Sequence, residues 1–225
     1  MHLRSLLFAL ALLLKFGITA GTEVSAGSVQ VLTFIEVRVE ARGHANGVLR
    51  QQANAPRERQ ASPGQIIRLQ EISRPERFVM LERETPAGGG ETRALPKDLT
   101  DDLTAPPDQR LNRVFDEADA AADAQFDAHA RFYVVTHVDV TTPDRSRVES
   151  GLHKLADAAR QSDGNLGFEI LQQIDRPNHF NLISAWLGEF PFHTFASSAP
   201  AREFRQTIAP LLGSPYDERF FRRVD

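Results

Sequence analysis

The sequence predicts an α+β protein made of two tandem copies of one β-α-β-β-α-β unit. Three pairs of short segments recur in the same order, and the displacement within the pairs is 103, 102 and 109 residues. The pairs are VLTFIEV at 31–37 with VVTHVDV at 134–140, QEISRPERF at 70–78 with QQIDRPNHF at 172–180, and PDQRLNRV at 107–114 with YDERFFRR at 216–223. Two copies at a nearly constant displacement indicate a duplication, because solenoids need at least three repeats.

The second copy, residues 131–225, shows the element order most clearly. Residues 132–140 are rich in β-branched and aromatic side chains, which predicts a strand. Thr142-Pro143 then provides a cap residue and a proline for the first turn of a helix that ends before Asp163-Gly164-Asn165. The apolar stripe of this helix is expected to comprise Val148, Leu152, Leu155 and Ala159.

The remaining elements of the second copy complete a recognisable unit. They are a strand at 167–174, a turn at 176–178, a strand at 180–187, a helix from Pro191 to about Ile208, and a closing strand at 219–224. The order β-α-β-β-α-β is the ferredoxin-like unit, in which helices cover one face of a four-stranded sheet. The other face is apolar and needs a partner. The first copy supplies one, so we expect two sheets packed face to face as a pseudo-dimeric α/β barrel.

The first copy, residues 28–114, keeps the strands better than the helices. Strands are expected at 29–39, 66–72 and 78–84. The helix expected over 45–60 is weakened by glycine and proline, and 86–107 is expected to be a loop with at most a short helix. The alanine-rich segment 115–130 is expected to be a helix that connects the copies, or else an acidic linker.

Residues 1–20 resemble a secretory signal peptide. A basic start, including Arg4, precedes nine apolar residues, Leu6–Leu14. This run is too short for a membrane span, which needs about 20 residues. Cleavage is expected after Ala20 or Ala26, which would place the mature protein in the periplasm or outside the cell without a stable membrane span. Otherwise the segment is a mistaken upstream start or an N-terminal helix packed on the domain, and the protein is cytoplasmic.

Composition excludes several classes of function. The formal net charge is −4 and there is no basic run, so a nucleic-acid groove is not expected. The absence of cysteine excludes disulfides, thiolate catalysis, iron–sulfur clusters and cysteine-type zinc sites. No histidine pair or cluster is typical of another metal site, so no metal is expected.

Two segments of the second copy resemble the antibiotic biosynthesis monooxygenase family, whose members are small dimeric α/β-barrel proteins. They are GNLGFEILQQIDRPNHFNLISAW at 164–186 and FRQTIAPLLGSPYDERFF at 204–221. The resemblance implies that O₂ oxidises a phenolic or quinol-type substrate without a metal or cofactor, in a dry pocket between sheet and helices. It also implies that the chain is either a monomeric pseudo-dimer or a homodimer.

The resemblance and the residues themselves together supply the candidate site residues. His193 and His137 are the catalytic candidates, and Trp186, Asn181, Phe195 and Tyr216 are the substrate-binding candidates. The family's histidine corresponds to Phe195, and His193 stands two positions earlier, about 200° around a helix. We therefore expect His193 to point away from the pocket unless Pro191 shifts the helix start.

The other candidate residues have structural alternatives. His137 aligns with Phe34 of the first copy, so it is either a general base with a pKa near 6.5 or a partly buried structural histidine. Trp186 could equally be a core residue, and Asn181 could belong to a turn. Asp217 is expected to pair with an arginine such as Arg219.

Three functions remain open from the sequence. The first is a cofactor-independent monooxygenase. The second is a catalytically silent, exported barrel that binds a small molecule or is purely structural, which the degraded first copy and the displaced His193 favour. Haem degradation on the same barrel ranks third, because no haem-ligating histidine can be placed.

Overall fold

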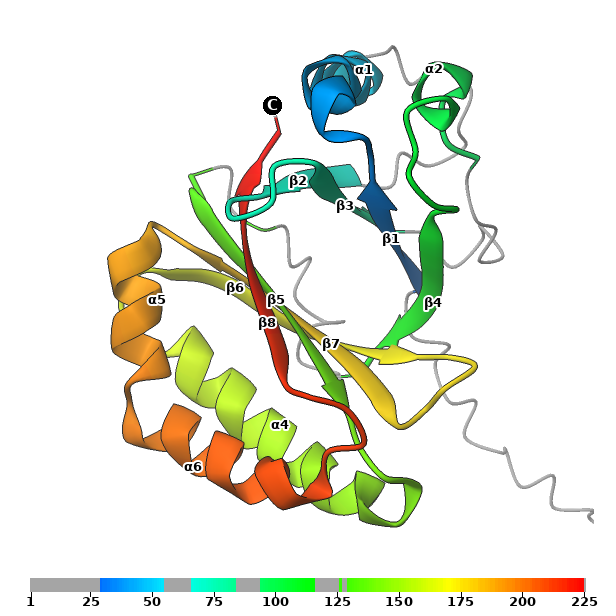
Figure 1. The fold of residues 1–225 in the computed structure, drawn as a ribbon. Helices are drawn as coiled ribbons and strands as arrows, with labels where there is room; N and C mark the ends of the chain where they lie inside the picture. Colours follow the sequence, from blue (N-terminus) through cyan, green and yellow to red (C-terminus); the bar gives the residue numbers. More distant parts are fainter. Residues whose placement is uncertain (1–28, 55–65, 84–93, 116–125, 127–128, 225) are drawn as a thin grey trace, which may run out of the picture.

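The computed structural model describes residues 29–54, 66–83, 94–115, 126 and 129–224, which form a closed eight-stranded barrel (Figure 1). The strands are β1 (Val29–Glu36), β2 (Ile66–Glu71), β3 (Arg77–Arg83), β4 (Asp108–Val114), β5 (Phe132–Asp139), β6 (Asn165–Gln173), β7 (His179–Trp186) and β8 (Asp217–Arg223). The expected signal peptide and most of the expected connecting helix lie outside the described residues. Within the described ranges, no helix is long and apolar enough to cross a bilayer.

Both halves of the barrel have the same antiparallel strand order. The N-terminal half runs β4-β1-β3-β2, and the C-terminal half runs β8-β5-β7-β6. In each half the fourth strand therefore lies beside the first, and the third lies between the first and second. This is the ferredoxin-like arrangement that the element order predicts.

The two sheets form one closed barrel, which confirms the predicted barrel. Strand β2 pairs with β8, and β4 pairs with β6, so the sheets join at both edges. Closure satisfies the edge N–H and C=O groups that two separate sheets would leave unpaired. The inner faces still bury a shared apolar core, which includes Leu32, Ile67, Leu69, Val79, Leu81, Tyr133, Val135, Leu171, Ile183 and Phe221.

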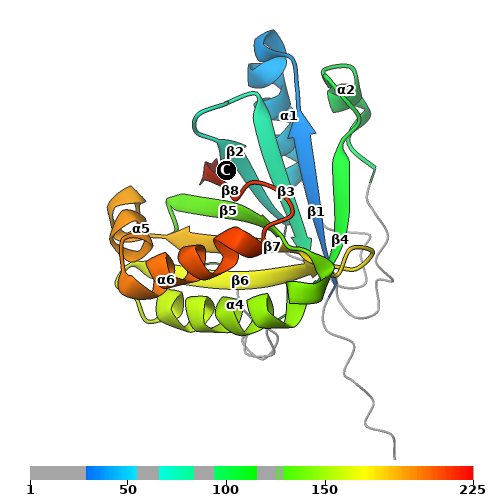
Figure 2. The same ribbon diagram turned by 60° about the horizontal axis from the view of Figure 1, so that its bottom comes forward.

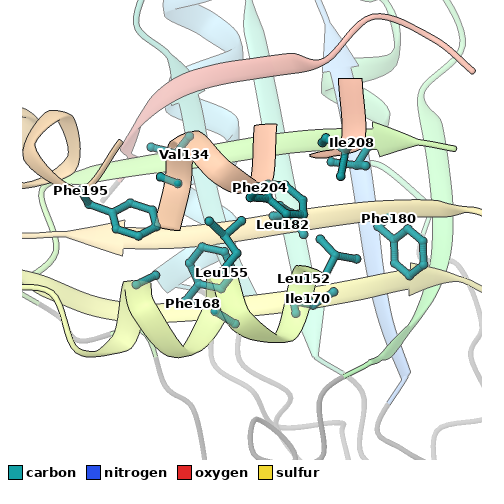
Figure 3. Packing of buried hydrophobic residues seen from close by; sticks show 14 of the residues in the cluster. Val134, Leu152, Leu155, Phe168, Ile170, Phe180, Leu182, Phe195, Phe204 and Ile208 are labelled. Carbon is teal, nitrogen blue, oxygen red and sulfur yellow. The ribbon is translucent and has the colours of Figure 1, made fainter. Parts of the chain in front are cut away.

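Helices cover the outer face of each half to different extents (Figures 1 and 2). The C-terminal half carries α4 (Arg145–Arg160), α5 (Glu189–Ala196) and α6 (Ala199–Ile208), and the N-terminal half carries α1 (Arg42–Asn54) and α2 (Lys97–Thr100). Short 3₁₀ helices lie at Val39–Ala41, Thr142–Asp144 and Ala209–Leu211. The predicted stripe of α4 is buried against the sheet, where Leu152 and Leu155 meet Phe204 of α6 (Figure 3).

The predicted single helix from Pro191 to Ile208 is wrong, because the chain forms α5 and α6 with a break at Ser197-Ser198. The Ser198 hydroxyl accepts a hydrogen bond from the Ala201 backbone N–H at 3.5 Å, and Pro200 occupies the first turn of α6. A serine cap followed by proline starts a new helix rather than continuing an old one. The short helix allowed within 86–107 is present as α2.

Candidate functional site

A pocket lies between the outer face of the C-terminal sheet and its helices, and we call it the helix-side pocket. Its apolar wall comes from α4, α5, α6 and the sheet, and consists mainly of Leu155, Phe168, Phe192, Phe195 and Phe204. Its polar residues are Thr136, Ser184, Arg205, Tyr216 and Glu218. The free volume is about 20 Å³, which is room for roughly one water molecule.

Tyr216 and Glu218 form the polar centre of this pocket. Tyr216 precedes β8, and Glu218 lies on the β8 face that points toward the helices, because side chains alternate along a strand. The Tyr216 hydroxyl donates a long hydrogen bond of 3.5 Å to Glu218 Oε2. Arg205 of α6 lines the same pocket and donates to the Ala196 carbonyl oxygen.

Burial shifts the acid–base properties of both groups. Desolvation raises the pKa of the Glu218 carboxyl, although Arg205, Tyr216 and His193 oppose the rise. Desolvation, followed by the charge of Glu218, raises the pKa of the Tyr216 hydroxyl. Tyr216 is therefore a neutral donor at neutral pH, and Glu218 is a more basic carboxylate than an exposed glutamate.

Trp186 lies in the core beneath this pocket and does not line it. Its side chain is fully buried, and its indole Nε1 donates to Ser184 Oγ at 2.9 Å. The Phe195 ring stacks on the indole with the centroids 5.2 Å apart, and Phe195 itself lines the pocket. The structure thus places Trp186 behind the wall that Phe195 forms.

His193 lies outside the helix-side pocket, as its register predicts. Helix α5 begins at Glu189, so Pro191 does not shift the helix start. The His193 side chain is 51% exposed, and its Nε2 lies 3.3 Å from Glu189 Oε1. Its ring is 6.0 Å from that of Phe220, and its charge acts on Glu218, so it occupies the rim near the polar centre.

His137 and Asn181 lie on the opposite face of the sheet, inside the barrel. His137 Nδ1 is 3.3 Å from Asn181 Oδ1 and 3.4 Å from Arg110 Nη1, and Asn181 donates to Asn112 Oδ1 at 3.1 Å. Burial, helped by the charge of Arg110, lowers the pKa of His137, so its imidazole is neutral near pH 7. The six candidates therefore do not converge on one site.

Sequence reasoning missed Glu218 and Arg205. Alternation along β8 puts Glu218 and Phe220 on one face and Asp217, Arg219 and Phe221 on the other, so a face assignment for the DERFFRR strand would have found Glu218. No such signal existed for Arg205, because its position depends on the break between α5 and α6. Asp217 pairs with Arg219 as predicted, with Arg219 Nη2 2.5 Å from Asp217 Oδ2.

Comparison with known proteins finds a family similarity over part of the chain that forms this pocket. Residues 131–207 match the family model described as antibiotic biosynthesis monooxygenase. This match runs from β5 to α6 and ends before Tyr216 and Glu218. No curated protein matches the chain significantly.

Solved structures share the fold over nearly the whole chain. A proposed monooxygenase from Fusobacterium nucleatum has a TM-score of 0.72 at 9% identity, over 89% of this chain and 94% of its own. An anthrone oxidase-like protein has a TM-score of 0.63 at 10% identity, over 89% and 93%. A ferredoxin-fold protein from Listeria monocytogenes, related to antibiotic biosynthesis monooxygenases, has a TM-score of 0.58 at 14% identity, over 88% and 95%. At these identities the likeness shows the fold alone, which is a barrel of known architecture.

Proposed function

We propose that the helix-side pocket is the site of a cofactor-independent monooxygenase that acts on a small phenol or quinol. The observation that carries this proposal is the partly buried pair of Tyr216 and Glu218 in an aromatic pocket. Phenolic substrates need an apolar, water-poor wall and one group that takes the phenolic proton. The family match over residues 131–207 supports the same assignment.

Glu218 is the proposed general base. A carboxylate whose pKa is raised accepts a proton from a phenol more readily than an exposed glutamate does. Arg205, on the same wall, stabilises the phenolate that results. The ring carbon made electron-rich by the phenolate then reacts with O₂. In the keto tautomer of the substrate this ring carbon is a methylene, and the reaction converts it into a carbonyl. One oxygen atom of O₂ stays on the carbon, and the other leaves as water with the two hydrogens of the methylene.

The proposed roles of the remaining candidates follow from their positions. His193, at the rim, exchanges the proton of Glu218 with solvent. Tyr216 donates to Glu218 and orients its carboxylate, while Phe195, held by Trp186, packs against the substrate ring. Because the free volume is so small, α5 and α6 must move apart at Ser197-Ser198 before a substrate can enter.

The small free volume also favours the second function, a catalytically silent barrel that binds a small molecule or is purely structural. A pocket filled by its own side chains needs no substrate to be stable. Under this alternative the hydrogen bond between Tyr216 and Glu218, which are partly buried, has a structural role only. Export through an N-terminal signal is proposed for either function.

Oxygen consumption distinguishes the two functions. The purified protein is mixed with anthrone or a reduced quinol, without added metal or flavin, and O₂ uptake is followed. We expect turnover that falls about 10²- to 10⁴-fold in Glu218→Gln and is unchanged in Glu203→Gln, an exposed glutamate on α6. His193→Ala and Trp186→Phe are expected to lower turnover less.

Two outcomes would contradict the monooxygenase assignment. Absence of O₂ uptake with every phenol tested would favour the silent barrel, and equal activity of Glu218→Gln and Glu203→Gln would remove Glu218 from the reaction. Titration with haem, followed by absorbance, tests the haem-degrading function separately.

A further inference from the structure

The interior of the barrel opens at one end into two adjoining cavities, which together we call the barrel mouth. Their volumes are about 180 and 200 Å³, and they share Phe34, Asp108 and Arg219 as lining residues. His137 lines the barrel mouth, whereas its neighbour Thr136 lines the helix-side pocket. The sheet therefore separates the two sites, and the family match offers no role for the barrel mouth.

Charges at the barrel mouth are almost all paired. Each guanidinium already has a carboxylate partner: Arg77 Nε lies 3.1 Å from Glu36, Arg110 Nη2 lies 2.6 Å from Asp108, and Arg219 Nη2 lies 2.5 Å from Asp217. The residues that line the two cavities include three guanidinium groups and four carboxylates. The fourth carboxylate is that of Glu71. Because the pKa of His137 is lowered, its ring adds no positive charge near pH 7. Arg74, which lies outside the lining, also contacts Glu36 at 3.2 Å, so among the described residues Glu71 is the one carboxylate of the lining without an ion-pair partner.

Glu71 is the buried member of this set. Its residue is 4% exposed, and its Oε1 accepts a hydrogen bond from the Ser73 hydroxyl at 2.7 Å. Its Oε2 has no hydrogen-bond partner among the described residues. Arg219 interacts with Glu71 electrostatically, but its guanidinium donates its hydrogen bonds to Asp217. A buried carboxylate oxygen without a donor is costly, so this position favours a ligand that brings one.

The walls beside Glu71 are apolar. Phe34, Val79 and Phe221 line the cavity that contains Glu71, and Val135 lines the adjoining one. The Arg110 guanidinium lies over the Phe34 ring, 4.6 Å from its centroid, which fixes that ring at the wall. A ligand here meets the Glu71 side chain and a hydrocarbon surface, and it reaches the buried Oε2 once that side chain turns toward the cavity.

We propose that the barrel mouth binds a small organic monocation, a primary amine with an apolar or aromatic body, whose ammonium group donates to Glu71 Oε2. An anionic ligand is disfavoured, because it would have to displace a carboxylate from each guanidinium it approached. A neutral alcohol would satisfy the oxygen but would not pair with the charge of the Glu71 carboxylate. The proposal is independent of the proposed oxidation, because it uses the other face of the sheet.

Calorimetric titration of the full chain tests this inference with three probes of one size, benzylammonium, benzyl alcohol and benzoate. We expect benzylammonium to bind and the other two to bind at least tenfold more weakly. Glu71→Gln keeps the shape of the side chain and removes its charge, so it should weaken benzylammonium binding by about 10- to 100-fold. The matched control is Glu40→Gln, which removes a charge from an exposed glutamate and should leave binding unchanged.

Three results would overturn the proposal: benzoate binding as tightly as benzylammonium, equal binding of benzylammonium by Glu71→Gln and the unaltered protein, or no amine binding at millimolar concentration. If Glu71→Gln does not fold, amide chemical-shift mapping on the unaltered protein replaces it. The chemical-shift changes caused by benzylammonium are then expected to centre on β2, β5 and β8 at the barrel mouth. Changes centred on α4, α5 and α6 would contradict the proposal.

Discussion

The two halves of this barrel share a strand order but differ in what covers their outer faces. The C-terminal half buries its sheet beneath α4, α5 and α6, and twenty buried residues form that core cluster. The N-terminal half has α1 and the four-residue α2, and its described core cluster contains eight buried residues. Strand pairing is thus preserved where helix covering is not.

This difference shows which interactions the barrel requires. Closure depends on the β2–β8 and β4–β6 pairs and on the shared interior core, and both halves contribute to these. A pocket between sheet and helices needs two long amphipathic helices, and only the C-terminal half has them among the described residues. The N-terminal half therefore acts mainly as a partner that closes the barrel.

The largest expected loss of stability comes from truncating one buried leucine in the core beneath the helices of each half. Leu152→Ala in α4 should lower the free energy of unfolding by about 4 kcal/mol, and Leu49→Ala in α1 by about 2 to 3 kcal/mol, because a smaller cluster can relax around the cavity. Both leucines are fully buried, so burial itself is matched. Urea denaturation measures both values, and a larger loss for Leu49→Ala would reverse the comparison.

Gly167 tests the packing between the linker and the C-terminal sheet. Its φ is +157°, and a Cβ there would lie 2.6 Å from the Phe126 ring. Gly167→Ala should therefore cost about 2 kcal/mol through strain and the displacement of Phe126. Thermal denaturation followed by circular dichroism measures the loss. If the variant is as stable as the unaltered protein, Phe126 is not a fixed part of the interior core.

Gly47 tests whether weak helix propensity limits the stability of α1 in the N-terminal half. It lies exposed within α1, and a Cβ there would meet nothing within 4 Å. Gly47→Ala should stabilise the protein by about 0.5 to 1 kcal/mol, because alanine loses less conformational entropy in a helix. A rise in the urea midpoint would show that weak helix propensity, rather than missing contacts, limits α1. No change would assign the weakness to the smaller core.

Substitution of Glu218 is expected to have a small effect on the free energy of unfolding, and this effect depends on pH. The folded-state pKa of Glu218 is raised, so its contribution to stability is fully present below the unfolded value near 4.3 and is lost as pH rises through the folded value. Glu218→Gln should therefore be more stable than the unaltered protein at pH 8, by up to about 1 kcal/mol, and equal to it near pH 4.

Urea midpoints at both pH values, with Glu203→Gln as the exposed control, test this pH dependence. A variant that is less stable at pH 8 than at pH 4, relative to the unaltered protein, would show that the attraction of Arg205 outweighs burial. That result would leave a conventional ion pair in the pocket and remove the reason to assign Glu218 as a base.

The element order and the strand faces were readable from the sequence, because both depend on local patterns. Alternation within VVTHVDV fixes that His137 and Thr136 point to opposite faces, and the stripe through Leu152 and Leu155 fixes the buried side of α4. The repeated islands predicted two units of one topology. The start of α6 at Ser198-Ala-Pro200 also has a local signal, a serine cap followed by a proline.

Only the tertiary structure decided how these elements close and which side chains meet. Pairing of Glu71 with Phe221 across β2 and β8 joins residues 150 positions apart, and no local pattern encodes that contact. The same closure buries Glu71 at the barrel mouth, and the folding of α6 over the sheet brings Arg205 into the pocket of Glu218. Periodicity assigns each side chain to a face, but the charge and free volume of a site depend on which distant segments complete it.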